Sequence, residues 1–184
     1  MLYDNGQLLR VYARAAGLYA SDLYRRTATR TLDYLLRELA DRREGGLPAD
    51  APVRGFFAAQ DAEVNHREGL NYLWTREDVH AALDAEDAAF AERVYGLAAG
   101  PNFRDPHHPD EAARNVLHLA AAPEVLARQE RISERDLWAR LDRINAQLLA
   151  VRSRRAQPGT DRKVITAWNG LAIASLADSA ALLH

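Results

Sequence analysis

Apolar residues at the start of the chain repeat with the three-to-four-residue spacing of an amphipathic helix. They predict one helix over about residues 8–16, ending near Gly17, and a second over 23–39 with arginines on its other face. Together the two segments predict a helical hairpin. Gly45 and Gly46 would end it, and the prolines of residues 47–55 predict a loop.

The middle of the chain starts with short segments and continues with helices. Residues 55–64 and 70–75 are rich in aromatic residues and bracket the polar turn NHREG, so they predict two short strands of an extended hairpin. Thr75 and Ser133 are helix-capping types placed directly before helical patterns. The expected helices cover about residues 76–83, 85–95 and 134–154.

Between these helices lies a turn-rich stretch, and one more helix closes the chain. Residues 98–115 predict a long loop, a feature that is often functional in compact domains. Residues 116–120 predict a short strand, and the last helix is expected to start near Trp168. The arginines of residues 140–155 are interpreted as a solvated helix surface.

The pair Asn-Gly occurs at the start of the first and of the last helix. Asn5 and Gly6 align with Asn169 and Gly170, and both pairs open apolar segments. The last helix is apolar on nearly all sides, as expected of a helix surrounded by other helices. Hairpins that complete one another in this way indicate a helical toroid or solenoid.

Composition narrows the class of protein. With 48% hydrophobic and 27% charged residues among 184, the chain belongs to the globular class, and its net charge of -2 leaves no basic field for nucleic acid. No apolar run approaches the roughly 20 residues of a spanning helix, so we expect a soluble protein that does not bind membranes. The chain has no cysteine, which excludes disulfides and thiol chemistry. The cytoplasm is the expected location.

Five ordered motifs resemble a known family. They are MLYDNGQL, FFAAQDAE, EGLNYLWT, NVLH and DRKVITAWNGLAI. In order and spacing they resemble the bacterial YyaL-like, spermatogenesis-associated thioredoxin-domain proteins. The resemblance implies a six-hairpin, glycosidase-like (α/α) barrel, of which residues 1–184 would form the first part, with a small β insertion at about residues 55–75. The thioredoxin domain would be absent, so no redox activity is implied.

The barrel architecture that the resemblance implies is shared with glycoside hydrolases and sugar epimerases, and the carboxylates and histidines are candidates for their chemistry. Glycosidases use a pair of carboxyl groups as acid and base or nucleophile. Asp4 and Asp61 are the candidate pair, and His118 is a candidate proton-transfer group. The alternatives are a helix-start acid for Asp4, a turn-forming residue for Asp61 and a structural histidine for His118.

Other residues are candidates for holding a substrate. Tyr72 and Trp74 alternate along an expected strand, and aromatic rings stack on the apolar faces of sugars, with core packing as the alternative. Polar and aromatic residues also lie in the motifs FFAAQDAE and EGLNYLWT and around the start of the last helix. In a barrel they would line a cleft at the barrel end. These further candidates are Gln60, Glu68, Asp161, Lys163, Trp168 and Asn169.

Two functions follow from these residues. The first is a carbohydrate-active or sugar-binding domain with general acid/base chemistry, its cleft lined by Asp4, Asp61, Trp74, His118 and Trp168. The second is a non-catalytic helical module that binds a partner and belongs with a thioredoxin-like protein. Neither needs a metal or a cofactor. An incomplete toroid exposes apolar helices, so we also expect self-association or pairing with further barrel segments.

Overall fold

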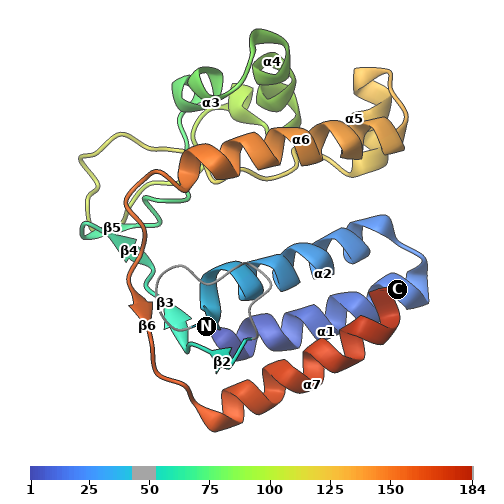
Figure 1. The fold of residues 1–184 in the computed structure, drawn as a ribbon. Helices are drawn as coiled ribbons and strands as arrows, with labels where there is room; N and C mark the ends of the chain where they lie inside the picture. Colours follow the sequence, from blue (N-terminus) through green and yellow to red (C-terminus); the bar gives the residue numbers. More distant parts are fainter. Residues whose placement is uncertain (43–52, 184) are drawn as a thin grey trace. The chain divides into compact units, whose positions relative to one another are not determined.

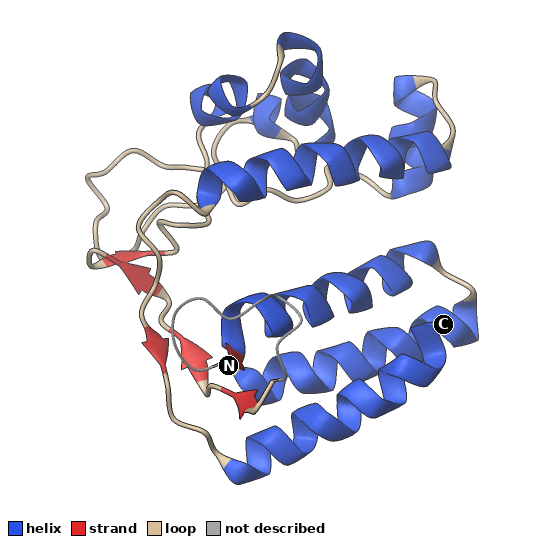
Figure 2. Cartoon of the chain, in the orientation of Figure 1, coloured by secondary structure: helices blue, strands red, loops and turns tan. Residues whose placement is uncertain are grey.

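The computed structural model describes residues 1–42 and 53–183, and it is mainly helical, as predicted (Figure 1). The predicted hairpin end at Gly45 and Gly46 and most of the loop at 47–55 lie outside these residues. Three small antiparallel sheets of two strands each accompany the helices (Figure 2). The toroidal arrangement stays a prediction.

The chain forms two compact units, and each is described by itself. The first comprises Met1–Asp61 and Gly159–His184, and the second comprises Ala62–Pro158. The first unit therefore combines the N-terminal and the C-terminal segment of the chain. Helices and strands of the two segments contact each other in this unit. The expectation of one partial barrel domain over residues 1–184 stays a prediction.

Three α-helices, one short π-helix and two short strand pairs make up the described part of the first unit. Its elements are α1 (Leu2–Tyr19), α2 (Asp22–Tyr34), the π-helical η1 (Leu35–Leu39), β1 (Ala40–Asp41), β2 (Gly55–Phe56), β3 (Ala59–Gln60), β6 (Thr160–Asp161) and α7 (Thr166–Leu183). Helix α1 packs against both α2 and α7 (Figure 1). Strand β1 pairs with β2, and β3 pairs with β6. Helix α1 runs past the predicted end at Gly17 to Ala20, whose left-handed backbone (φ 49°) closes it.

Both Asn-Gly pairs lie in first turns, as predicted, but their glycines have different surroundings. Gly6 is buried where α1 meets α7, and a side-chain carbon added there would lie 3.2 Å from the main-chain Cα of Ala172. A side-chain carbon added at Gly170 would have no atom within 4 Å. The glycine of the first pair therefore permits close contact between two helices, whereas the glycine of the second pair has no such role.

Replacing Gly6 tests this helix contact. We expect Gly6→Leu to lower the free energy of unfolding by about 1–3 kcal/mol, because the new side chain must push α1 away from the Ala172 backbone. The matched control is Gly17→Leu on the same helix, where an added side-chain carbon would have no atom within 4 Å. Leucine forms helix better than glycine, so the control should be neutral or stabilised in urea unfolding. Equal losses in both variants would contradict the close contact.

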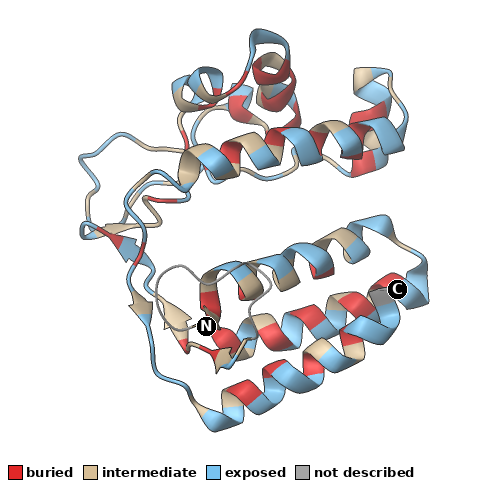
Figure 3. Ribbon diagram, in the orientation of Figure 1, coloured by how far each residue is buried: buried red, intermediate tan, exposed pale blue. Residues whose placement is uncertain are grey.

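Helix α7 is less enclosed than its composition predicts. Ala172 lies against Gly6 of α1 and is buried, but Leu171 and Ile173 are 46% and 59% exposed. Exposed stretches, in pale blue, recur along the whole helix (Figure 3). The expectation of a helix surrounded by other helices is therefore wrong for the part of the chain that the structure describes. An apolar sequence marks what a helix is able to bury, and within the described residues α7 contacts helices α1 and α2.

The second unit is built around one long helix. Its elements are β4 (Glu63–Val64), β5 (Arg67–Glu68), α3 (Arg76–Ala82), α4 (Ala85–Val94), the 3-10 turn η2 (Leu97–Ala99), α5 (Pro123–Glu130) and α6 (Glu134–Arg152). The predicted caps are confirmed, since Thr75 accepts from the N–H of Asp78 and Ser133 from that of Asp136. Leucines and an isoleucine of α6 form the centre of a core that also contains Phe90 and Trp138.

Two predictions for this unit need correction, and one helix was missed. The hairpin joins β4 to β5, not residues 55–64 to 70–75, because Asn65 and His66 have positive φ angles and make a two-residue turn. The predicted strand at residues 116–120 is absent, and the bridges to Phe103 and Trp74 are made by Arg114 and Asn115. Helix α5 was not predicted at all. None of the described helices is both long and apolar enough to cross a membrane.

Candidate functional site

The second unit has a partly open cavity of about 230 Å³, which we call the Asn71 cavity. Segments distant in the sequence meet there: the turn after β5, the first turn of α3, the bridge residue Arg114 and the chain that leaves α6. Most of its polar atoms belong to Asn71, Asp78, Arg114 and Arg155. The remaining lining residues are Val64, Leu70 and Ala156.

Arg155 is fixed in the wall of the Asn71 cavity by several contacts. Its guanidinium lies 3.9 Å from the ring centroid of Trp74, and Nη1 donates to the carbonyl oxygens of Leu73 at 2.7 Å and of Asn71 at 3.3 Å. Burial lowers the pKa of Arg155, and its neighbour Arg114 adds to this effect, while Asp78 opposes it. The guanidinium group of an arginine nevertheless stays protonated near neutral pH. Arg155 is therefore a held positive charge.

Arg114 brings a second positive charge to the same point. Nη1 of Arg114 and Nη2 of Arg155 each lie 3.8 Å from the same oxygen, Oδ2 of Asp78. That distance is too long for a hydrogen bond. The Asp78 carboxylate is also engaged elsewhere, because it accepts from the main-chain N–H of Thr75 as part of the α3 cap. Two guanidinium groups thus share one carboxylate, and the site keeps a positive excess.

Asn71 is held in the lining of the Asn71 cavity. The residue is 2% exposed, and its Nδ2 donates to the carbonyl oxygen of Ala156 at 2.8 Å. Its Oδ1 is buried and has no hydrogen-bond partner among the described residues, which is uncommon for a buried polar atom. Asn71 thus joins the turn after β5 to the chain that leaves α6.

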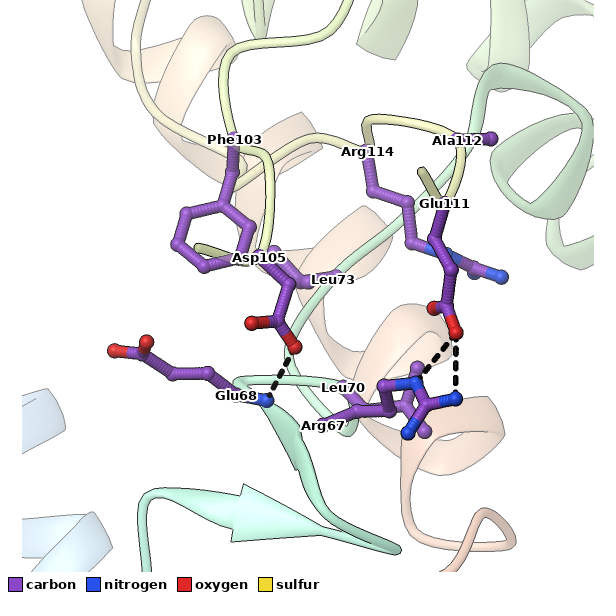
Figure 4. A pocket seen from close by; sticks show the side chains of 9 residues that line it. All are labelled: Arg67, Glu68, Leu70, Leu73, Phe103, Asp105, Glu111, Ala112 and Arg114. Carbon is purple, nitrogen blue, oxygen red and sulfur yellow. Dashed lines mark hydrogen bonds and ion pairs between the residues drawn. The ribbon is translucent and has the colours of Figure 1, made fainter. Parts of the chain in front are cut away.

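A smaller cavity of about 20 Å³ adjoins the Asn71 cavity, and Leu70 and Arg114 line both (Figure 4). It has room for about one water molecule. Its walls are tied by the ion pair between Arg67 and Glu111 at 2.6 Å and by the Glu68 main-chain N–H, which donates to Asp105 at 3.0 Å. These contacts attach the loop after η2 to the β4–β5 hairpin.

Asp105 is the centre of that attachment. Burial raises its pKa, but the N–H groups of His107 and Glu68 and the ring of His108 outweigh this and leave the pKa below its ordinary value. The carboxylate therefore stays ionised near neutral pH. Among the described residues, no group of three or more side chains that could hold a metal ion occurs. The adjacent histidines His107 and His108 therefore belong to no such group.

The first unit contains seven of the predicted site residues. The β3–β6 ladder places Gln60 opposite Thr160 and Asp161 opposite Ala59, so Gln60, Asp61 and Asp161 lie together. Lys163 donates to the carboxylate of Asp161 at 3.1 Å and thereby holds the pKa of Asp161 low. Asp4 is exposed in the first turn of α1.

Three of these residues make internal contacts. Gln60 accepts from the hydroxyl of Tyr34 at 3.0 Å. Trp168 packs edge-on against Tyr3, with ring centroids 4.8 Å apart. The Asn169 side chain is buried and bonds both main-chain polar groups of Phe56. Asn169 therefore acts as a structural clamp, and substrate roles for the other two stay predictions.

The second unit contains the other four predicted site residues. Trp74 is 4% exposed beneath Arg155, whereas Tyr72 is 38% exposed and lies beneath Arg152 at 4.5 Å. The Glu68 side chain lines the smaller cavity, and its carboxylate points away from Asp105 (Figure 4). His118 is exposed, with Nδ1 3.2 Å from Nδ2 of Asn102. Of these four, none lines the Asn71 cavity.

The interpretation of the arginines at 140–155 as a solvated surface is wrong for three of them, because Arg140, Arg152 and Arg155 are half-buried and lie over aromatic rings. Arg143 and Arg154 are exposed, as the interpretation expects. Sequence reasoning also missed Asn71 and Arg114. A usable signal was present for Asn71, which is a polar residue inside the aromatic motif LNYLWT.

Comparison with known proteins gives a relationship but no family model, since none matches the chain. Over its whole length the chain is 27% identical to spermatogenesis-associated protein 20 of Homo sapiens and to that of Mus musculus. It is also 29% identical, over 96% of its length, to an uncharacterised protein of Caenorhabditis elegans. The chain spans about a quarter of the length of these relatives, 24% to 25%. This supports a relationship to spermatogenesis-associated protein 20, whereas the glycosidase-like barrel stays a prediction.

Proposed function

We propose that the chain is part of a carbohydrate-active or sugar-binding protein and that the Asn71 cavity holds the sugar. The observation that carries this proposal is the mixed lining of the Asn71 cavity, in which the polar side chains of Asn71, Asp78, Arg114 and Arg155 occur together with apolar ones. Sugars combine hydroxyl groups with an apolar carbon face in the same way. Leu70 and Val64 add an apolar wall against which the carbon face of a sugar ring can pack.

The size of the cavity fits a small ligand. Its volume of about 230 Å³ is below the roughly 300–1,000 Å³ of pockets that hold drug-sized molecules. A monosaccharide, or the end unit of a longer chain, matches this volume better than an extended oligosaccharide. General acid/base chemistry by Asp4, Asp61 and His118 stays a separate proposal, because Asp4 and Asp61 belong to the first unit and His118 lies outside the lining of the Asn71 cavity.

Thermal unfolding in the presence of sugars tests the proposal. We expect one class from a panel of monosaccharides and oligosaccharides, uronic acids included, to raise the melting temperature. At a hundredfold excess over the dissociation constant, a ligand that binds only the folded chain adds about 2.7 kcal/mol of stability. The effect should shrink in Asn71→Ala and persist in Asn102→Ala, an exposed asparagine outside the Asn71 cavity. A panel without any shift would contradict the proposal.

A second candidate function is that of a non-catalytic binding module, and the exposed apolar side chains of α1 and α7 favour it. Both helices expose large apolar side chains, and exposed apolar patches commonly mark protein contacts. We expect the purified chain to associate at micromolar concentration in multi-angle light scattering, and a monomer under these conditions would contradict this. The exposed residues are Leu8, Val11, Leu18, Tyr19, Leu171, Ile173 and Leu182.

A further inference from the structure

We infer that the ligand of the Asn71 cavity carries an anionic group, a carboxylate or a phosphate, which Arg114 and Arg155 bind. This inference rests on the proposed function and specifies its substrate class. A sugar acid or a sugar phosphate satisfies both proposals, because its sugar ring fits beside Leu70 and Val64 and its anionic oxygens accept from the guanidinium groups.

The charge balance of the wall supports an anion. Within the lining of the Asn71 cavity, Arg114 and Arg155 supply two positive charges, and Asp78 supplies the one negative charge. Each guanidinium lies 3.8 Å from Oδ2 of Asp78, so both point to nearly the same place, yet neither makes a hydrogen bond to it. An anion placed between them would gain short, charge-assisted hydrogen bonds that Asp78 leaves unmade.

The two arginines have different roles in this wall. Arg155 is fixed by two carbonyl oxygens and by the ring of Trp74, so its position is set before any ligand arrives. The Arg114 side chain is 40% exposed, and its recorded contact is the long pair with Asp78. Arg114 is therefore the residue to replace in a test, because Arg155 also supports the surrounding structure.

Calorimetric titration of four compounds provides the test: glucose, glucuronate, glucose 6-phosphate and inorganic phosphate. We expect at least one sugar anion to bind the unaltered chain about tenfold more tightly than glucose, the low end for hydrogen bonds to charged groups. Arg114→Gln should remove most of that difference. Arg135→Gln makes the same change in charge at an exposed residue outside the cavity lining and should preserve it. Comparing glucuronate with glucose 6-phosphate identifies the anionic group as carboxylate or phosphate.

A second variant shifts binding in the opposite direction. Asp78→Asn removes the competing carboxylate, while its amide oxygen can still accept from Thr75 and cap α3. It should tighten binding of the preferred sugar anion several-fold and leave glucose unchanged. This gain cannot arise from a variant that merely unfolds, and a loss or no change would count against the inference.

The possible failures are distinguishable. Glucose that binds as tightly as both sugar anions, in the unaltered chain and in Arg114→Gln, overturns the anionic inference and leaves the sugar proposal standing. Inorganic phosphate that binds through Arg114 while no sugar compound binds supports the anion contact and overturns the sugar proposal. If none of the four binds, both are overturned.

Discussion

Replacing Asp87 with asparagine is expected to lower the free energy of unfolding by about 3 kcal/mol, near the lower end of what breaking a buried ion pair costs. The Asp87 side chain is 3% exposed in the first turn of α4. It accepts from Nε of Arg140 at 2.8 Å and from Nη2 of Arg143 at 3.0 Å. The variant removes the buried carboxylate that both arginines bind, although Arg143, at 58% exposure, is able to turn toward water.

The neighbouring acid provides a matched control. Glu86 makes the same kind of contact, accepting from Nη2 of Arg140 at 2.9 Å, but its side chain is 86% exposed. Exposed ion pairs contribute little, so Glu86→Gln should cost less than about 0.5 kcal/mol in urea unfolding. Similar losses for Asp87→Asn and Glu86→Gln would show that burial does not set the strength of this contact.

The same pair of variants predicts a pH dependence. Burial raises the pKa of Asp87, but hydrogen bonds from Arg140 and Arg143 outweigh burial and leave the pKa below its ordinary value. The folded chain therefore binds this proton less readily than the unfolded chain. The stabilisation is present above the unfolded pKa of about 3.9 and is lost as the pH falls through the folded pKa. The stability gap between the unaltered chain and Asp87→Asn should narrow below about pH 4, and a constant gap would contradict the assignment.

The sequence predicts best those features that neighbouring residues determine. The caps at Thr75 and Ser133 were found because a cap needs its helix within three residues. Helix α5 was missed because it has eight residues and starts with a proline, which is favourable in a first helical turn but also typical of loops. Aromatic residues drew the strand prediction to residues 70–75, although the turn that makes the hairpin is Asn65 and His66.

The candidate site was harder to predict than the helices, because long-range packing assembles it. Asn71, Arg114 and Arg155 lie far apart in the chain and meet at the Asn71 cavity. Their residue types carry no signal by themselves, and Arg155 belongs to a run of arginines that resembles a solvated surface. Only the contact with Trp74 shows that this arginine lies against the core. Sequence patterns report on which side of a helix a residue lies, but not on what lies opposite.

Asn169→Ala is expected to lower the free energy of unfolding by about 2–4 kcal/mol, because two buried main-chain groups would lose their partners. Oδ1 of Asn169 accepts from the N–H of Phe56 at 2.8 Å, and Nδ2 donates to the Phe56 carbonyl oxygen at 3.0 Å. Phe56 is 4% exposed, so water does not replace these bonds easily. The side chain thereby fastens β2 to the start of α7.

The other Asn-Gly pair provides the control for Asn169, because Asn5 occupies the first turn of α1 as Asn169 occupies that of α7. Asn5 is half-buried, and its Nδ2 donates to the carbonyl oxygen of Met1 in an exposed hydrogen bond, so Asn5→Ala should leave the urea midpoint nearly unchanged. Asn169→Asp separates the two bonds, since it can still accept from Phe56 N–H but turns a second acceptor toward the Phe56 carbonyl. It should therefore destabilise as well. Full stability of Asn169→Ala would contradict the clamp.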